Sequence, residues 1–237
     1  MAFFGLWIAA KFLIKDKKIV GEFVQAGYRS SAAILGVAFI QNIYGDSGMA
    51  PVMIIGCVPL FNIFAVLVLT FEGEKDGGKG NIINSLINIV KNPIIIGIVL
   101  GVSASLLKID FPEIIDKTLA SLAKMASPLA LITIGAGFEG RKAIAKIKPT
   151  IAATMIKLVV LPAVFLPIAI KLGFRDQALV ALIIMLGSPT TPSSYIMAKN
   201  MGHEGVLTSS VVVATTLMSS LCLTFWIFVA RYFGYII

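Results

Sequence analysis

Apolar residues in this chain gather in long runs that short polar loops separate. Within the runs, apolar and polar residues do not alternate as they do in the strands of a membrane barrel. Lipid leaves the backbone only helices or closed barrels, because no water reaches its polar groups there. The pattern therefore predicts an all-α membrane protein. We expect eight helices, over residues 1–14, 22–44, 49–71, 92–107, 114–138, 148–172, 176–199 and 205–235.

Composition and charge support the same class. Hydrophobic residues make up 58% of the chain and charged residues 14%, whereas a soluble domain holds roughly 25% charged residues. The net charge of +8 comes from Lys and Arg in the loops between apolar runs, where basic residues report orientation in the membrane. We therefore expect membrane lipid around the protein and no nucleic-acid partner.

The basic residues fall unequally on the two sides of the membrane. Alternating the eight spans places Lys15, Lys75 and Lys142 on the side that holds the larger share of Lys and Arg. The positive-inside rule makes that side cytoplasmic. We expect a multi-pass protein of the plasma membrane, with both chain ends outside and the polar linker over 72–91 in the cytoplasm.

An internal repeat relates the two halves of the chain. The segment that starts at Ser31 aligns with the one that starts at Ser188, and the flanking helices align with them. An odd number of crossings separates the copies, so their topologies are opposite, which is a signature of secondary transporters. The run over 1–14 reaches only about 21 Å, short of the roughly 30 Å hydrocarbon core. We expect two further helices upstream of residue 1; the alternative is a protein of eight helices with a short first one.

The linker divides the chain into functional parts. Its polar portion reads EGEKDGGKG, and the amphipathic stretch NIINSLINIVK that follows suits the membrane interface. We expect transport helices of the first repeat over 1–71, a cytoplasmic linker with an interfacial helix over 72–91, a scaffold helix pair over 92–138, and transport helices of the second repeat over 139–237.

Two prolines interrupt the helix predicted over 176–199. Pro189 and Pro192 each remove a backbone donor, so the helix is expected to break near the middle of the membrane. A broken helix exposes free carbonyls on one half and free N–H groups on the other, and such ends bind ions and anions. The alternative is a kink whose hydroxyls bond back to their own helix. The candidate substrate-binding residues here are Ser188, Pro189, Thr190, Thr191, Pro192, Ser193 and Ser194.

The aligned segment of the first half lacks proline but carries further candidates. Arg29 precedes Ser30 and Ser31, and an arginine inside a membrane helix is a functional candidate unless its side chain reaches the interface. Lys157 lies deeper in its own helix and is harder to explain by such reach. Polar Asn62 and Thr216 follow the two breaks, with interhelical hydrogen bonding as the alternative role.

Several blocks of the chain together resemble the auxin efflux carrier family. They include EFVQAGYRSSAAILGVAFIQNIYGDSG, KNPIIIGIVLG, ASPLALITIGAGF, IKLVVLP and SSYIMAKNMGHEG, in that family's order. The resemblance begins at what would be the family's third helix, so it implies an N-terminally truncated, ten-helix inverted-repeat transporter with two crossing broken helices. It also implies a small organic anion as substrate, a moving transport domain, and a scaffold that often forms a homodimer.

These features favour a secondary transporter that binds a small organic carboxylate. The interiors of the broken helices hold no Asp or Glu, so coupling to protons or sodium at the crossing is not expected. No metal-ligand cluster, cofactor motif or catalytic constellation is present in the sequence. We therefore expect no enzyme, no metal and no cofactor. The alternatives are a membrane sensor that does not transport and an inactive gene fragment of the same fold.

Overall fold

Every regular element that the structure describes is a helix. The computed structural model describes residues 2–32, 37–46, 48–72 and 93–236, and no strand lies within these ranges. The longer elements are α1 (Ala2–Leu13), α2 (Val20–Tyr28), α3 (Val37–Tyr44), α4 (Ala50–Phe71), α6 (Pro93–Leu106), α7 (Glu113–Ala136), α8 (Gly140–Ala145), α9 (Ile147–Met155), α10 (Leu161–Lys171), α11 (Asp176–Gly187), α12 (Ser193–Asn200) and α13 (Val206–Tyr232).

Four helices of the described chain are long and apolar enough to cross a membrane. They are α4, α7, α13 and the continuous helix Ile147–Lys171, in which the π-helical turn Ile156–Val160 joins α9 to α10. The apolar helices α1 and α11 are shorter. The structure is thus all-helical and suited to a membrane. The expected linker and interfacial helix lie almost entirely outside the described residues.

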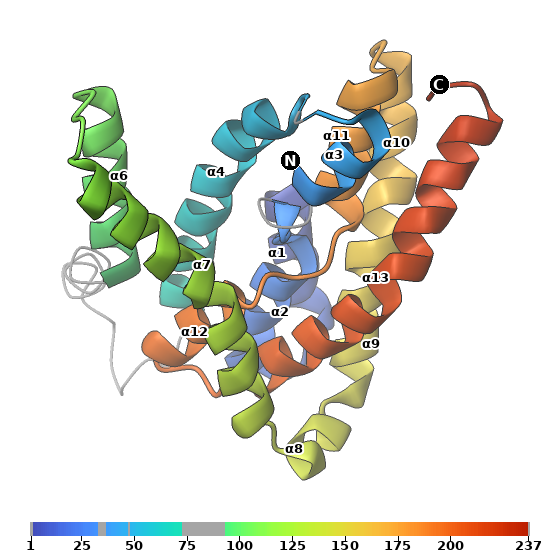
Figure 1. Cartoon of the computed structure of the whole chain (residues 1–237). Coiled ribbons are helices and arrows are strands. Elements are labelled where there is room, and N and C mark those ends of the chain that lie inside the picture. Colours follow the sequence, from blue (N-terminus) through green and yellow to red (C-terminus); the bar gives the residue numbers. More distant parts are fainter. Residues whose placement is uncertain (1, 33–36, 47, 73–92, 237) are drawn as a thin grey trace.

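Two of the predicted helices are interrupted. The helix expected over 22–44 is divided into α2 and α3, and the one expected over 176–199 is divided into α11 and α12. In Figure 1, α3 and the start of α11 lie toward one end of the molecule, while α2 and α12 lie toward the other. The two interrupted helices therefore run in opposite directions, and their breaks lie between the two ends.

Apolar packing holds these helices around the breaks. One cluster joins α1, α2, α4 and the start of α13, and within it Phe3 stacks on Phe64 with ring centroids 4.6 Å apart. A second cluster joins α10, α11, α13 and the outer part of α4. Both clusters combine side chains from the two halves of the sequence. The breaks are consequently held by both.

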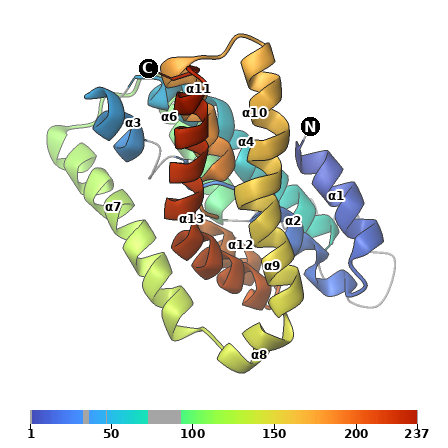
Figure 2. The same ribbon diagram turned by 90° about the vertical axis from the view of Figure 1, so that its right-hand side faces the viewer.

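The helices α6 and α7 lie at the periphery. Figure 2 shows α7 along one edge of the molecule, with α1 along the other. Most apolar side chains of α7 are exposed, including Ile114 and Ile132. Its inner contact runs through Ile134, which packs with Tyr195 of α12 and Val212 of α13. The exposed apolar surface suits lipid or a further protein surface.

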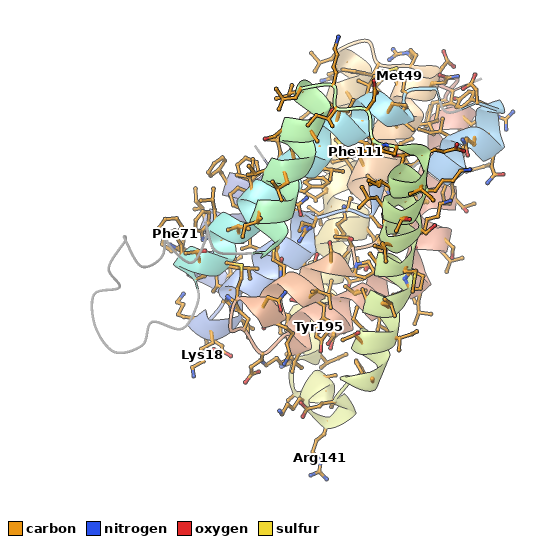
Figure 3. All side chains as sticks on the ribbon, turned by 60° about the vertical axis from the view of Figure 1, so that its left-hand side comes forward. Lys18, Met49, Phe71, Phe111, Arg141 and Tyr195 are labelled. Atoms are coloured by element: carbon orange, nitrogen blue, oxygen red, sulfur yellow. The ribbon has the colours of Figure 1, made fainter. Side chains whose placement is uncertain are left out.

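Two basic residues that are far apart in the sequence lie at the same end of the bundle. In Figure 3, Lys18 and Arg141 lie toward the same end, and Met49 lies at the other. The alternating spans predict one common side for Lys15 and Lys142, which lie close to these two residues in the sequence. The end itself carries an ion pair between Lys146 and Glu204, with 2.6 Å between Nζ and Oε2.

Candidate functional site

Proline chemistry explains the break between α11 and α12. Pro189 has no N–H to give to the carbonyl of Met185, four residues earlier. The next amide, that of Thr190, donates to the Oγ1 of Thr215 at 3.1 Å instead of to Leu186. The helix therefore ends at Gly187 and leaves two carbonyls of its last turn free of helical partners. It begins again at Ser193 as α12.

The break between α2 and α3 arises without a proline. α2 ends at Tyr28, and Arg29 adopts an extended conformation with φ −67° and ψ 142°. The amide of Ser31 donates to the carbonyl of Pro189 at 2.9 Å, and the Oγ1 of Thr190 donates to the carbonyl of Ala26 at 2.7 Å. Each break thus supplies the hydrogen-bond partners that the other one lacks, and the two interrupted helices are in direct contact.

Gln25 adds a third link between the two breaks. Its side chain is fully buried, and Nε2 donates to the carbonyl of Ser194 at 3.0 Å. The sequence analysis did not single out this residue. An amide inside an apolar run was the available signal, but nothing local to the run shows that its partner lies on α12. Thr215, on α13, completes the contact by accepting the amide of Thr190.

Lys157 lies with its ammonium group at the end of α11. The side chain is 0% exposed, and Nζ donates to Ser30 Oγ at 2.5 Å, to the Leu186 carbonyl at 2.6 Å and to the Met185 carbonyl at 3.4 Å. The hydroxyl of Ser30 donates in turn to the carbonyl of Met185. These are the two carbonyls that the break releases. The ammonium therefore occupies the negative end of the helix dipole of α11.

Arg29 lies beside the beginning of α12. It is 2% exposed, and Nη2 donates to Asn62 Oδ1 at 2.8 Å and to Ser193 Oγ at 3.1 Å. Nη1 approaches only the sulfur of Met197, at 3.6 Å, and Nε is buried without any partner. None of the carboxylates that the structure describes pairs with this guanidinium. Arg29 is thus a buried cation in which Nε has no hydrogen-bond acceptor and Nη1 has only a weak one.

Apart from Thr190, whose hydroxyl donates to Ala26, the hydroxyls of the proline motif form two groups. Thr191 and Ser193 are solvent-accessible and lie 3.2 Å apart through their side-chain oxygens, beside Arg29. Ser188 and Ser194 are fully buried, and their hydroxyls have no partner in the structure. Pro192 is half-buried next to the accessible pair. The structure therefore brings Arg29, Asn62, Thr191, Pro192 and Ser193 together.

Thr216 lies away from this group. It is exposed on α13, its hydroxyl donates to the carbonyl of Val212 at 2.7 Å, and it lines a cavity of about 370 Å³ between α7 and α13 with Ile134 and Phe138. This hydrogen bond lies within α13, as is common for hydroxyls in membrane helices, and is not the interhelical bond named as the alternative role. A substrate role for Thr216 stays a prediction.

A buried acid lies at the start of the first broken helix. Glu22, in the first turn of α2, is 1% exposed, although it lies outside the apolar interior of the predicted helix. Its carboxylate accepts the amides of Gly205 and Thr208, each at 2.9 Å, and the hydroxyl of Thr208 at 2.9 Å. It caps the start of α13 and makes no contact with the breaks. Its position near the predicted helix end gave no sign of this burial.

The fold and the site together define a class of protein. The chain is an all-helical membrane protein in which two oppositely directed, interrupted helices exchange hydrogen bonds at their breaks. A group of three or more His, Cys, Asp or Glu side chains able to hold a metal is absent from the described part of the chain.

Comparison with known proteins identifies the family. A profile described as "Membrane transport protein" matches residues 3–227, and the chain therefore belongs to this family of transport proteins, which are not enzymes. This confirms the resemblance seen in the sequence. The chain is also similar to the "Uncharacterized transporter YfdV" of Escherichia coli (strain K12) and to its namesake in Shigella flexneri, each with 24% identity over 202 residues. The match covers 83% of this chain but 64% of each relative, so the chain spans less than two thirds of their length.

Proposed function

We propose that the protein is a secondary transporter of small organic anions, which works by alternating access around the two broken helices. Membership of a family of membrane transport proteins supports transport. The oppositely directed broken helices support an inverted repeat, since half-helices that meet inside the membrane are the substrate sites of such transporters. An anionic substrate is supported by the buried guanidinium of Arg29, which has no described acid partner. The proposal rests on this observation.

The surroundings of Arg29 favour a carboxylate ligand. A buried guanidinium is costly unless its charge is paired and its donors are used, and Arg29 lacks both a described acid partner and a partner for Nε. The start of α12 lies next to it and adds the partial positive charge of a helix N-terminus. Thr191 and Ser193 present hydroxyls to solvent at the same place. A carboxylate bound there would accept hydrogen bonds from groups that now lack acceptors.

The same chemistry disfavours a cationic substrate. A cation near Arg29 would meet a formal positive charge and no described carboxylate. A monoacid or a diacid such as malate fits the cluster of hydroxyls, whereas an aromatic acid would need apolar walls next to it. We propose that α6 and α7 belong to a scaffold that forms a homodimer in the plasma membrane, with the linker 72–91 in the cytoplasm.

Binding of acids to the intact protein in lipid nanodiscs tests the anion site. Malate, malonate and indole-acetate are compared with their amides, in the wild type and in Arg29→Gln. Losing charged hydrogen bonds worth about 1.5–3 kcal/mol should weaken acid binding roughly 10- to 100-fold. Arg141→Gln is the matched control, because Arg141 is exposed on α8 at the end of the bundle. The proposal would be contradicted if the amides bound as tightly as the acids, or if Arg29→Gln and Arg141→Gln bound the acids equally well.

Flux separates the proposal from its alternatives. Acid binding accompanied by uptake into proteoliposomes indicates a transporter. Binding without uptake indicates a membrane sensor on the same fold, and the absence of both in folded protein indicates an inactive gene fragment.

A further inference from the structure

The break in α11 creates a set of oxygen ligands of the kind that binds a monovalent cation. The carbonyls of Met185 and Leu186 have no helical donor, because Pro189 lacks an N–H and the amide of Thr190 is bonded to Thr215. The hydroxyl oxygen of Ser30 lies beside them. In transporters with broken helices, unwound carbonyls and the C-terminal ends of half-helices coordinate the coupling cation. Here these oxygens already have a cation among them.

We infer that the ammonium group of Lys157 is a tethered cation that fills this site. Nζ lies 2.5 Å from the hydroxyl oxygen of Ser30, 2.6 Å from the carbonyl oxygen of Leu186 and 3.4 Å from that of Met185, so each of its three N–H groups has an oxygen to donate to. The three oxygens that contact Nζ are neutral, which suits a monovalent cation better than a divalent one, and the C-terminal end of α11 adds a partial negative charge. The ammonium takes the place that sodium would take in a cation-coupled protein.

The shape of the surrounding helix supports a dedicated role for Lys157. The residue lies in the π-helical turn Ile156–Val160, and turns of this kind are frequent at functional sites in membrane and soluble helices. The indole N–H of Trp226 donates to the carbonyl of Leu158 at 3.0 Å in the same turn. A cavity of about 330 Å³ adjoins the site and is lined by Lys157, Met185 and Leu186 together with apolar residues such as Phe61. A small solute therefore has room next to the ligands.

One consequence concerns transport and rests on the proposed function. A cation that is bonded covalently to the protein cannot be released, so uptake of the anion should not depend on a sodium gradient. The cation site itself does not rest on that function, because its ligands are internal to the protein and its occupancy can be measured without any substrate.

Chemical rescue of the truncated side chain tests the inference. Wild type, Lys157→Ala, Lys157→Met and Lys171→Ala are purified and unfolded by heat, without substrate, in chloride salts of sodium, ethylammonium or N-methylglucamine at equal ionic strength. Lys171 is exposed at the end of the same long helix and serves as the control position. The wild type and Lys171→Ala should unfold at the same temperature in all three salts.

Lys157→Ala should unfold at a lower temperature in N-methylglucamine, and sodium or ethylammonium should raise its midpoint by about 5 °C at saturating concentration. Lys157→Met should show no such rescue, since its side chain fills the site without supplying a charge. Two results would overturn the inference: a sodium-specific shift in the wild type, or a Lys157→Ala protein that behaves alike in all salts. The inference is also contradicted if Lys157→Ala folds in none of the three salts, because free sodium or ethylammonium should take the place of the missing ammonium group. A negative result here leaves the anion-binding test untouched.

Discussion

Glu22→Gln is expected to detach the start of α13 from α2. In the structure, the carboxylate of Glu22 accepts three hydrogen bonds, from the amide of Gly205 and from both the amide and the hydroxyl of Thr208. A glutamine has one acceptor oxygen in that place and turns an NH2 group toward the remaining donors. The hydroxyl of Thr208 can reverse its role and accept, but the amide cannot, so one buried N–H loses its partner.

The size of the effect follows from these contacts. An unsatisfied buried amide costs about 1–3 kcal/mol, and the lost negative charge at a helix N-terminus costs a further 0.3–2 kcal/mol, roughly. We expect a loss of about 2–4 kcal/mol, which corresponds to a fall of roughly 4–16 °C in the unfolding midpoint for a chain of this size.

Thermal unfolding in nanodiscs at pH 7 measures this loss. Glu139→Gln is the matched control, because Glu139 forms an exposed pair with Lys142 on α8 and such pairs contribute about 0–1 kcal/mol. A Glu22→Gln midpoint within a degree or two of the control would refute the view that this carboxylate joins the two halves of the chain.

Two further predictions concern the loop between α12 and α13. Gly205→Ala should destabilise the protein by about 1–3 kcal/mol, because Gly205 has φ +72° and an added Cβ would lie 2.8 Å from Lys199 Cδ and 2.9 Å from Tyr195 Cε2. Gly97→Ala is the control and should not destabilise the protein, because Gly97 lies on open helical surface. Equal unfolding midpoints for the two variants would contradict the argument. The hydrogen bond from Lys146 and its positive charge hold the pKa of Glu204 below its ordinary value. A lowered carboxyl pKa contributes stability above the unfolded value of about 4.3, and that stability is lost as the pH falls through the folded pKa. The Glu204 side chain is 62% exposed, so the contribution is at most about 1 kcal/mol. Glu204→Gln should therefore lower the unfolding midpoint slightly at pH 7 and leave it unchanged near pH 3, and a difference that is constant over this range would assign the effect to something other than charge.

Local patterns in the sequence predicted the features that local chemistry determines. Runs of apolar residues identified the helices, because lipid demands them. Pro189 and Pro192 identified the break between α11 and α12, because a missing N–H acts within one turn. The described residues are all-helical in their regular segments, four of these helices are long and apolar enough to cross a membrane, and α11 and α12 are separated at the two prolines.

Local sequence patterns could not predict features that depend on partners far away in the sequence. The break after Tyr28 has no proline, and it is held by Pro189 and Thr190 from the other half of the chain. Gln25 and Glu22 looked like ordinary polar residues, since their partners on α12 and α13 are far away in sequence. The resemblance to the auxin efflux carrier family implied that the two broken helices cross, but it did not identify the atoms through which they bond.

The two buried cations at the breaks illustrate how structure can assign different roles to residues that look alike in sequence. Both were candidates for the same reason, a formal positive charge inside an apolar helix. Lys157 uses each of its N–H groups on oxygens of the protein, so a substrate carboxylate would have to break those bonds before gaining its own. Arg29 keeps Nε without a partner and Nη1 on a weakly accepting sulfur, so a carboxylate there would gain bonds without breaking comparable ones. The difference in hydrogen-bond satisfaction therefore favours Lys157 as the fixed cation that holds the broken end of α11 and Arg29 as the ligand for the transported anion.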